Sequence, residues 1–379
     1  MSDQKIVLIG PVYPYKGGIA HYTSLLINNL SKSYDIKIIS FKRLYPHLLY
    51  PGIMQKNYLD KTFEIFGVEY LIDSINPISW IWTAKKIISI KPDLIVFQWW
   101  NPFFAPSYLV IIEIFKLFAK AKILFICHNV LPHEKLPLDR WLTKAILRKG
   151  DCHLVQSLED EEKLLSIVPN AKYKKVPHPS YSIFKSENVS KKEARARLGI
   201  EDTEKLLLFF GFIREYKGLI YLIKALPQIK EKYPRVKLLV AGEFFHDKDF
   251  YFEEIEKLHL QGNIDIYDQY IPDQEVGIYF SATDLVVLPY VTATQSGVVQ
   301  IAYGFNKPVV VTSVGGLPEV VEHNRTGYVV PPQDPQQIAI AVIDFYKGEK
   351  EAVFAANICN QQERFSWDRL VEHIEHLCF

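Results

Sequence analysis

The sequence predicts an α/β protein made of two doubly wound, Rossmann-like domains that face each other across a cleft. Short apolar strands alternate with helical segments, which is typical of parallel sheets covered by helices on both faces. The alternation fills the first half and starts again after a polar, acidic segment at 186–202, which we expect to be a linker. A chain of 379 residues is long enough for two such domains. We therefore expect domains at 1–185 and 186–360, followed by a C-terminal helix at 361–379.

Composition indicates a globular protein with a large core and an uneven charge. Hydrophobic residues make up 49% and charged residues 23% of the chain. Residues 1–185 carry 24 Lys and Arg against 15 Asp and Glu, or +9, and the remainder carries 20 against 28, or −8; the two sum to the overall +1. A basic half beside an acidic half favours an anionic surface or substrate for the basic one. Two simply solvated faces remain an equal alternative.

Several functional classes are excluded by pattern. The four cysteines are widely spaced and show no metal-binding spacing, which favours a reducing compartment and no metal site. The first residues lack a signal-peptide layout. The most apolar stretch, Tyr108–Ile126, holds four charged residues, too many for a membrane span. We expect a cytoplasmic protein, with or without peripheral attachment to the inner membrane face, and neither a cofactor nor a nucleic-acid partner.

The first predicted strand, Lys5–Gly10, leads through a loop to a helix at 19–30. Gly10, Gly17 and Gly18 do not form the G-x-G-x-x-G pattern of a dinucleotide site. Adjacent glycines before a helix still allow the backbone to approach a ligand closely. The alternative is a loop that needs a positive φ.

A second strand at Asp35–Ser40 precedes an irregular segment, Phe41–Gly52, which is rich in aromatic, basic and proline residues, Tyr45 among them. Such a segment could line an acceptor cleft or enter a membrane interface. Simple packing is the open alternative.

Aromatic residues follow the strand Asp93–Phe97, which comes after a helix at Ile78–Ile90. Trp99 and Trp100 stand at the carboxyl end of this strand, where parallel sheets bind ligands. We place them on the acceptor side, with a core position as the alternative.

The richest polar cluster of the first half, HNVLPHE at His128–Glu134, directly follows the strand Lys122–Cys127. A lone histidine is usually structural, but the position of His128 at the carboxyl edge of the sheet favours a site. His133 is an acceptor-side candidate. No HExxH is present, so we reject a metal here.

The second half repeats the scheme. We expect strands at 205–211, 236–242, 264–267 and 285–289, and helices at 218–233, 249–258 and 273–281. Arg214 and Lys217 lie just past the first of these strands and before a helix. An arginine guanidinium can donate two parallel hydrogen bonds to phosphate oxygens, and a lysine adds a point charge. Two cations here therefore favour a diphosphate as the ligand. Two exposed surface cations are the alternative.

The stretch Thr294–Pro332 reads as helix, strand, glycine turn, helix and strand. Ser296 and Gly297 open the first helix, whose free backbone amides and dipole attract phosphate. Gly315–Gly316 turns the chain, and Pro318 starts the next helix. An ordinary βα unit is the alternative to an anion site.

These motifs resemble the group 1 glycosyltransferases, family 4, which have the GT-B fold. The resemblance rests on GPVYPYKGGIAHYT, HNVLPHE, GFIREYKG, and SGVVQIAYGFNKPVVVTSVGGLPEVV with NRTGYVVPP. It implies a retaining, metal-independent enzyme that uses a nucleotide-diphosphate sugar. It also implies that the C-terminal helix around Trp367 crosses back onto the first domain.

The resemblance implies a role for each matching residue. His128 contacts the transferred sugar, and Arg214 and Lys217 stabilise the leaving diphosphate. The donor-binding set comprises Gly17, Gly18, Gly211, Gly242, Glu243, Tyr270, Ile271, Gln295, Ser296, Gly297, Val298 and Gln300. Both glutamates of the family's E-x7-E motif are missing, because Ala293 and Ile301 occupy their positions, and Phe212 replaces a usual arginine.

The sequence thus predicts transfer of a sugar to a glycan or lipid-linked acceptor, in cell-surface polysaccharide or glycolipid synthesis. The acceptor attacks the face that the leaving group departs from, since no paired carboxylates suited to double displacement stand out. A nucleotide-sugar epimerase of the same fold and a catalytically silent carbohydrate-binding or scaffold protein are the alternatives.

Overall fold

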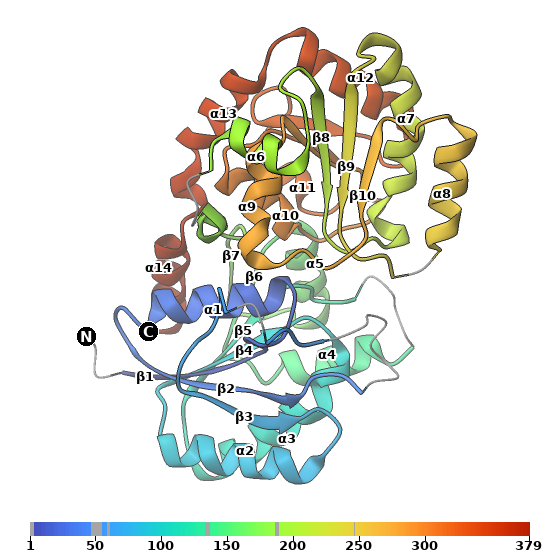
Figure 1. Cartoon of the computed structure of the whole chain (residues 1–379). Coiled ribbons are helices and arrows are strands. Elements are labelled where there is room, and N and C mark those ends of the chain that lie inside the picture. Colours follow the sequence, from blue (N-terminus) through green and yellow to red (C-terminus); the bar gives the residue numbers. More distant parts are fainter. Residues whose placement is uncertain (1–3, 47–54, 59–60, 133–136, 186–188, 246) are drawn as a thin grey trace. The chain divides into compact units, whose positions relative to one another are not determined.

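The structure, a computed structural model, describes residues 4–46, 55–58, 61–132, 137–185, 189–245 and 247–379 (Figure 1). Its internal contacts divide the chain into two units, Met1–Pro177 with Ser366–Phe379, and His178–Phe365. Each unit has its own sheet. The C-terminal segment therefore belongs to the first unit, although the second unit precedes it in the chain.

The first unit contains a seven-stranded parallel sheet in the order β3-β2-β1-β4-β5-β6-β7 over the described residues. Its strands are β1 (Lys5–Ile9), β2 (Asp35–Arg43), β3 (Val68–Asp73), β4 (Leu94–Trp99), β5 (Lys122–Cys127), β6 (Cys152–Val155) and β7 (Tyr173–Lys175). Ile6 on β1 is in register with Ile36 on one side and Leu94 on the other. The strand order reverses between β1 and β4, so residues after these strands border a natural ligand crevice.

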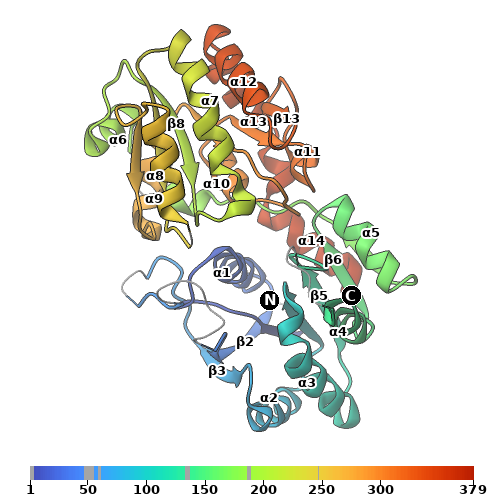
Figure 2. The same cartoon turned by 90° about the vertical axis from the view of Figure 1, so that its right-hand side faces the viewer.

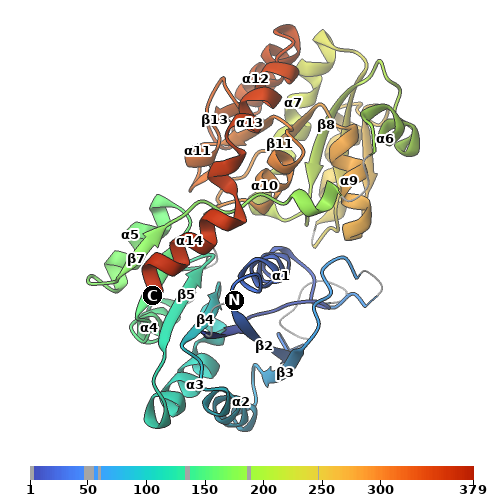
Figure 3. The same cartoon turned by 90° about the vertical axis from the view of Figure 1, so that its left-hand side faces the viewer.

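Helices cover both faces of this sheet. One face packs against α2 (Pro77–Ile90), α3 (Ala105–Phe118), α4 (Asp139–Leu147) and α5 (Leu158–Ile167). The other packs against α1 (Gly18–Leu30) and α14 (Trp367–Cys378), which lie side by side (Figure 3).

The helix α14 is amphipathic and completes the core of the first unit. The Ser366 hydroxyl caps it by accepting from the Arg369 amide. Leu370, Ile374 and Leu377, which lie on one side of the helix, are all buried in this core. The final helix thus stabilises the first unit by apolar burial.

The second unit contains a six-stranded parallel sheet in the order β10-β9-β8-β11-β12-β13 over the described residues. Its strands are β8 (Lys205–Phe210), β9 (Val236–Ala241), β10 (Ile264–Tyr267), β11 (Leu285–Leu288), β12 (Val309–Thr312) and β13 (Gly327–Val330). Its helices are α6 (Lys191–Leu198), α7 (Leu219–Lys232), α8 (Lys248–Lys257), α9 (Asp273–Ala282), α10 (Gly297–Gly304), α11 (Leu317–Val320), α12 (Pro335–Lys347) and α13 (Glu351–Asn360). The helices α7 and α12 pack together on one face (Figure 2). Here the order reverses between β8 and β11.

The expected linker at 186–202 is wrong in one respect, because its middle forms the helix α6. The Ser190 hydroxyl accepts from the Glu193 amide at the start, and Gly199, with φ +69°, ends the helix. Ala194 and Arg195 are buried, so α6 is part of the second unit. By contrast, the elements expected between Thr294 and Pro332 are confirmed as α10, β12, α11 and β13.

Candidate functional site

The reversal of strand order between β8 and β11 brings together the cationic and helix-start motifs of the second unit. Arg214 and Lys217 follow β8, and Ser296 and Gly297 follow the neighbouring β11. In open parallel sheets the crevice outside such a reversal point is the usual ligand site. These residues therefore form one candidate site at the carboxyl edge of the sheet.

Lys217 is held over Gly211 by a short 3-10 turn, η4 (Glu215–Lys217). A Cβ atom added to Gly211 would lie 3.1 Å from Lys217 Nζ and 3.7 Å from Val298 Cγ2. The ammonium group is thus close to the first turn of α10. Gly218 ends η4 at φ +66°, where a side chain would overlap the Pro289 carbonyl oxygen. The loop after β8 therefore has to pack tightly against the chain that follows β11.

The other cation, Arg214, lies over an aromatic ring. Its guanidinium carbon is 4.4 Å from the centroid of Phe245, and Lys217 Nζ is 5.8 Å from that of Tyr290. Cation–π contacts of this kind fix the direction of a cationic side chain. Neither Phe245 nor Tyr290 was predicted from the sequence to be part of the site.

Burial, followed by the charge of Arg214, lowers the pKa of Lys217 to about 7. The charge of Arg214 disfavours the protonated form of Lys217, and a bound anion reverses that effect. Lys217 is thus only partly protonated near neutral pH until an anion binds.

We expect the affinity for a nucleotide-diphosphate sugar to fall by about tenfold per pH unit as the pH rises above 7. The free protein loses the Lys217 proton above that pH, and the complex must take it up again, because the diphosphate raises this pKa. Isothermal calorimetry at a series of pH values from about 6 to about 9 measures how the affinity changes with pH. The control is Lys217→Arg, which stays charged throughout and should show a flat profile. A steep profile in this variant would assign the pH dependence to another group.

The start of α10 is capped from within. The Ser296 hydroxyl accepts from the Val299 amide and lies 3.3 Å from the Tyr290 hydroxyl. The first-turn amides of Gly297 and Val298 belong to the group that a helix cannot satisfy itself. The Oε1 atoms of Gln295 and Gln300 are buried and have no hydrogen-bond partner within the described chain. The side-chain amide oxygens of these two glutamines can therefore accept hydrogen bonds from a ligand.

Position 242 is the point where the loops after β8 and β9 touch. A side chain on Gly242 would overlap the Gly211 carbonyl oxygen, and the Ile213 amide donates to the carbonyl of Glu243 at 2.9 Å. Tyr270 donates to Asp273 at 3.2 Å, and Ile271 is buried. Phe212 packs against Phe245 and Tyr270, with centroids 4.9 and 6.1 Å apart. An aromatic cluster thus adjoins the predicted base-binding residues.

Replacing Gly242 by alanine should weaken nucleotide binding by at least tenfold, because the added methyl group would overlap the Gly211 carbonyl and displace the backbone over which Lys217 lies. A displacement of about 1 Å is enough to cost that much in a preorganised site. Calorimetry with the donor nucleotide measures the loss. Gly262→Ala is the matched control, because a Cβ there meets open space. Equal affinities for both variants would contradict the tight loop contact.

In the first unit, the predicted residues gather at the carboxyl edge near β1, β4 and β5. Gly17 caps α1 at φ +104°, and a Cβ on Gly17 or Gly18 would meet no atom within 4 Å. His128 Nε2 donates to Gln98 Oε1 at 2.6 Å, and the Tyr22 ring packs edge-on to it at 4.7 Å. This bond fixes the Nε2–H tautomer and the ring orientation. Gln98 was not predicted, because it lies within a buried strand.

The acceptor-side aromatic residues need a correction. Trp99 is fully buried in the core of the first unit, and its indole N–H donates to the Val130 carbonyl at 3.2 Å. It therefore supports the backbone at Val130 instead of contacting an acceptor. Trp100 is also a core residue and donates to the Tyr45 hydroxyl at 2.9 Å. Tyr45 is only partly buried, and His133 lies outside the described residues.

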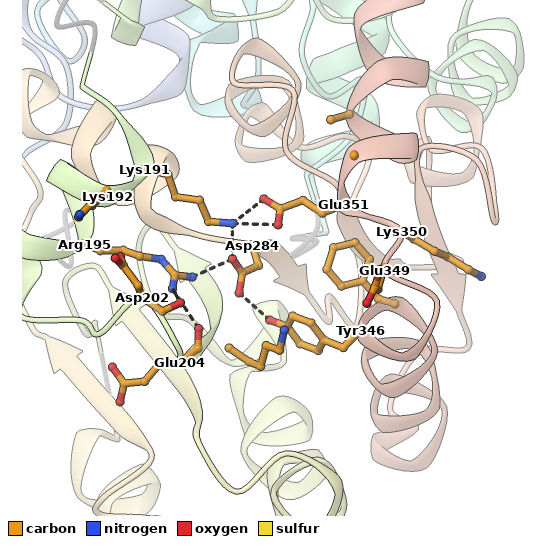
Figure 4. A pocket seen from close by; sticks show the side chains of 14 residues that line it. Lys191, Lys192, Arg195, Asp202, Glu204, Asp284, Tyr346, Glu349, Lys350 and Glu351 are labelled. Atoms are coloured by element: carbon orange, nitrogen blue, oxygen red, sulfur yellow. Dashed lines mark hydrogen bonds and ion pairs between the residues drawn. The ribbon is translucent and has the colours of Figure 1, made fainter.

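A pocket of about 780 Å³ opens at the opposite, amino edge of the second sheet (Figure 4). Its central carboxylate, Asp284, accepts from Arg195 Nη2 at 2.8 Å and from the Leu206 amide at 2.8 Å, and it pairs with Lys191 Nζ at 2.6 Å. Lys191 also pairs with Glu351. These charges compensate one another, so the network ties α6 to the sheet and to α13 rather than offering a charge to a ligand.

The described residues hold neither a metal-binding cluster nor a helix suited to cross a membrane. No cluster of three or more His, Cys, Asp or Glu side chains there has the arrangement of a metal site. In the same residues no helix combines the length and apolar character that a membrane crossing requires.

Residues 190–360 match the model of the family described as glycosyl transferases group 1. An uncharacterised glycosyltransferase of Methanocaldococcus jannaschii is 31% identical over 47% of this chain and 45% of its own. The D-inositol 3-phosphate glycosyltransferase of Segniliparus rotundus is 28% identical over 61% of this chain and 49% of its own. The chain thus spans about half the length of the curated relatives it matches.

Solved structures match the whole chain in fold. Sucrose-phosphate synthase from Thermosynechococcus elongatus has a TM-score of 0.77 at 19% identity, over 99% of this chain and 98% of its own. Anabaena HepE in complex with UDP has a TM-score of 0.76 at 19% identity, over 98% and 99%. The predicted GT-B fold with two parallel-sheet α/β domains is confirmed.

Proposed function

We propose that the chain is a retaining glycosyltransferase that moves a sugar from a nucleotide-diphosphate sugar to an acceptor hydroxyl. The observation that carries this proposal is the position of Lys217 Nζ over Gly211, next to the first turn of α10 and close to the charge of Arg214. An ammonium group with a lowered pKa, a second cation and free helix-start amides together form a site for two linked phosphates.

In the proposed reaction, Lys217 and Arg214 bind the diphosphate and neutralise the charge that develops as the C1–O bond breaks. They take the part that a metal ion has in other transferases. The acceptor oxygen attacks the same face of the sugar, and its proton passes to the leaving phosphate oxygen. This step is balanced, since one C–O bond forms, one breaks and the proton ends on the nucleoside diphosphate.

The first unit supplies the remaining groups of the proposal. His128, whose ring is fixed by Gln98, accepts or donates a hydrogen bond at a sugar hydroxyl. The open backbone at Gly17 and Gly18 lets a ligand approach without meeting a side chain. Gln295 and Gln300 offer neutral amide oxygens near Ala293 and Ile301, the positions at which the resemblance leads one to expect carboxylates.

For the acceptor we propose a glycan or lipid-linked sugar at the inner membrane face, as part of surface polysaccharide or glycolipid synthesis. The support is the +9 charge of residues 1–185. Anabaena HepE was solved with UDP and with UDP-glucose, which makes a uridine donor the first to try.

The experiment has two stages. A thermal-shift screen of UDP-, GDP-, ADP- and TDP-sugars identifies the donor, because a bound ligand raises apparent stability. The donor is then incubated with a synthetic polyprenyl-diphosphate-linked sugar, and NMR of the product determines the configuration of the new bond. Transfer with retained configuration is expected. A free, epimerised sugar would indicate an epimerase, and no thermal shift with any donor would indicate a silent scaffold.

A further inference from the structure

The outer surface of α2, α3 and α4 carries an unusual number of exposed apolar side chains. They are Ile78, Ile81 and Trp82 on α2, Leu117 and Phe118 on α3, and Leu138 and Trp141 at the start of α4. The most exposed, Leu117, shows 76% of its surface, and the two tryptophans show 64% and 66%. Tryptophan is rarely this exposed in a soluble protein that has nothing to bind.

These side chains lie on the sides of the helices that face away from the sheet. On α2, Trp80, Ala84 and Ile87 are buried against the sheet, while Ile78, Trp82 and Lys85 follow one outward stripe at helical spacing. Lys85 Nζ lies 4.9 Å from the centroid of the Trp82 ring. The stripe on α2 is therefore apolar where the helix begins and basic further along.

The helix α4 repeats this arrangement. Thr143, Ile146 and Leu147 are buried, whereas Trp141 and Lys144 point outward. Along the chain, each of these three helices connects two strands of the parallel sheet. All three therefore begin at the carboxyl edge of the sheet and run in the same direction. The helix α3 contacts both α2 and α4 (Figure 2). On α2 and α4 the exposed apolar side chains thus lie nearer the carboxyl edge than Lys85 and Lys144, whereas the exposed apolar pair of α3, Leu117 and Phe118, lies at its amino-edge end.

The segment that carries these three helices is basic. Residues 77–150, with the strands and loops between the helices, contain eleven Lys and Arg against four Asp and Glu, a net charge of +7. Some of the acids are engaged within the fold: Asp93 accepts from the Lys5 amide at 2.8 Å, and Glu113 pairs with Lys149. At the end of α3, the exposed Leu117 and Phe118 stand between Lys116 and Lys120. This end of the surface therefore presents cations around two apolar side chains.

We propose that the outer surface of α2, α3 and α4 docks onto a membrane that contains anionic phospholipids. Tryptophan and aliphatic side chains beside lysines are the signature of interfacial binding, in which apolar groups enter the acyl boundary and cations meet lipid phosphates. A second copy of the chain fits less well, because protein interfaces are depleted in lysine and two surfaces from the same basic segment repel each other.

This inference rests on the proposed function, in which the acceptor is lipid-linked. Docking by this surface would bring the protein to the membrane that contains the acceptor. The exposed apolar side chains of α2 and α4 lie where these helices begin, at the same edge of the sheet as Gly17, Gly18 and His128. A lipid-linked sugar in the docked membrane would therefore reach the first unit from the correct edge. Residues 47–52 of the segment Phe41–Gly52 lie outside the described residues.

The test is flotation of the full chain with phosphatidylcholine vesicles, with and without phosphatidylglycerol, at low and high salt. Wild-type protein should float with the anionic vesicles and lose binding as salt screens the cations. Lys85→Glu with Lys144→Glu should weaken binding by at least about 25-fold, since each surface charge is worth about a factor of five. Trp82→Ser with Trp141→Ser should weaken it by about tenfold or more.

Matched controls come from the second unit. Lys232→Glu and Phe250→Ser change an exposed lysine and an exposed aromatic ring on α7 and α8, and both variants should float like wild type. Unchanged melting temperatures and nucleotide affinities would show that every variant is folded.

Three results would overturn the proposal: wild type that ignores anionic vesicles at low salt, helix-surface variants that float normally, or a wild-type dimer that the tryptophan variants break. If wild type binds nucleotide but does not bind anionic vesicles, the docking surface is refuted and the proposed transferase is not. Vesicle binding without any nucleotide binding would refute the proposed transferase and leave the docking surface standing.

Discussion

Replacing Lys217 by alanine should lower turnover by about 100-fold or more with a donor that wild type uses. Its ammonium group lies over Gly211 beside the start of α10, where the leaving diphosphate develops charge in the proposed reaction. Without it, that charge has to be stabilised by Arg214 and backbone amides alone. Steady-state kinetics should show the loss mainly in kcat, because the interaction strengthens as the bond breaks.

Arg214→Ala should lose a similar factor, and the double variant should lose less than the product of the two, since both cations act on one group. Glu215→Ala is the matched control, because this side chain is exposed in the same 3-10 turn. It should retain wild-type turnover. Near-normal rates in both cation variants would remove these residues from the mechanism.

Replacing Asp284 by alanine should destabilise the protein by about 3–5 kcal/mol. The change leaves Arg195, which is buried and bonded to the backbone carbonyls of Glu201, Asp202 and Glu204, without its counter-charge. It also removes the acceptor of the Tyr346 hydroxyl at 3.2 Å. Urea unfolding followed by fluorescence measures the change in the free energy of unfolding.

Lys192→Ala is the control for this network, because Lys192 lines the same pocket but is exposed (Figure 4). Its effect should stay within about 0.5 kcal/mol. If the alanine variant does not fold, Asp284→Asn keeps the shape and an acceptor and should still lose stability. A loss below about 1 kcal/mol in both Asp284 variants would mean that the network is not a structural support.

The sequence predicted the fold well because short apolar strands and glycine turns have local signatures. The elements after Thr294 were predictable from the Ser-Gly helix start and from Gly315, whose φ of +48° suits glycine. The helix α6 was missed, although the capping pattern from Ser190 to Glu193 is visible, because its residues form no apolar stripe. The strand β3 was missed because exposed residues interrupt it.

The site was predictable only where it depends on short motifs. Arg214, Lys217 and the α10 start stand at strand ends, so the alternation of strands and helices predicted their position. The partners Gln98, Phe245 and Tyr290 were not predicted, because each meets its partner through the tertiary fold. Trp99 was misplaced for a related reason: only the tertiary structure shows that its indole donates inward to Val130. The Arg195–Asp284 pair joins residues 89 positions apart and has no local signature.

The most direct test of the central claim is calorimetric titration of UDP, GDP, ADP and TDP into wild type and into the Arg214→Ala, Lys217→Ala double variant. We expect one of these nucleoside diphosphates to bind to wild type at one site per chain, and the double variant to bind it at least 100-fold more weakly. Equal affinity in the two proteins, or no binding of any nucleotide to wild type, would contradict the assignment of this sheet edge as the donor site.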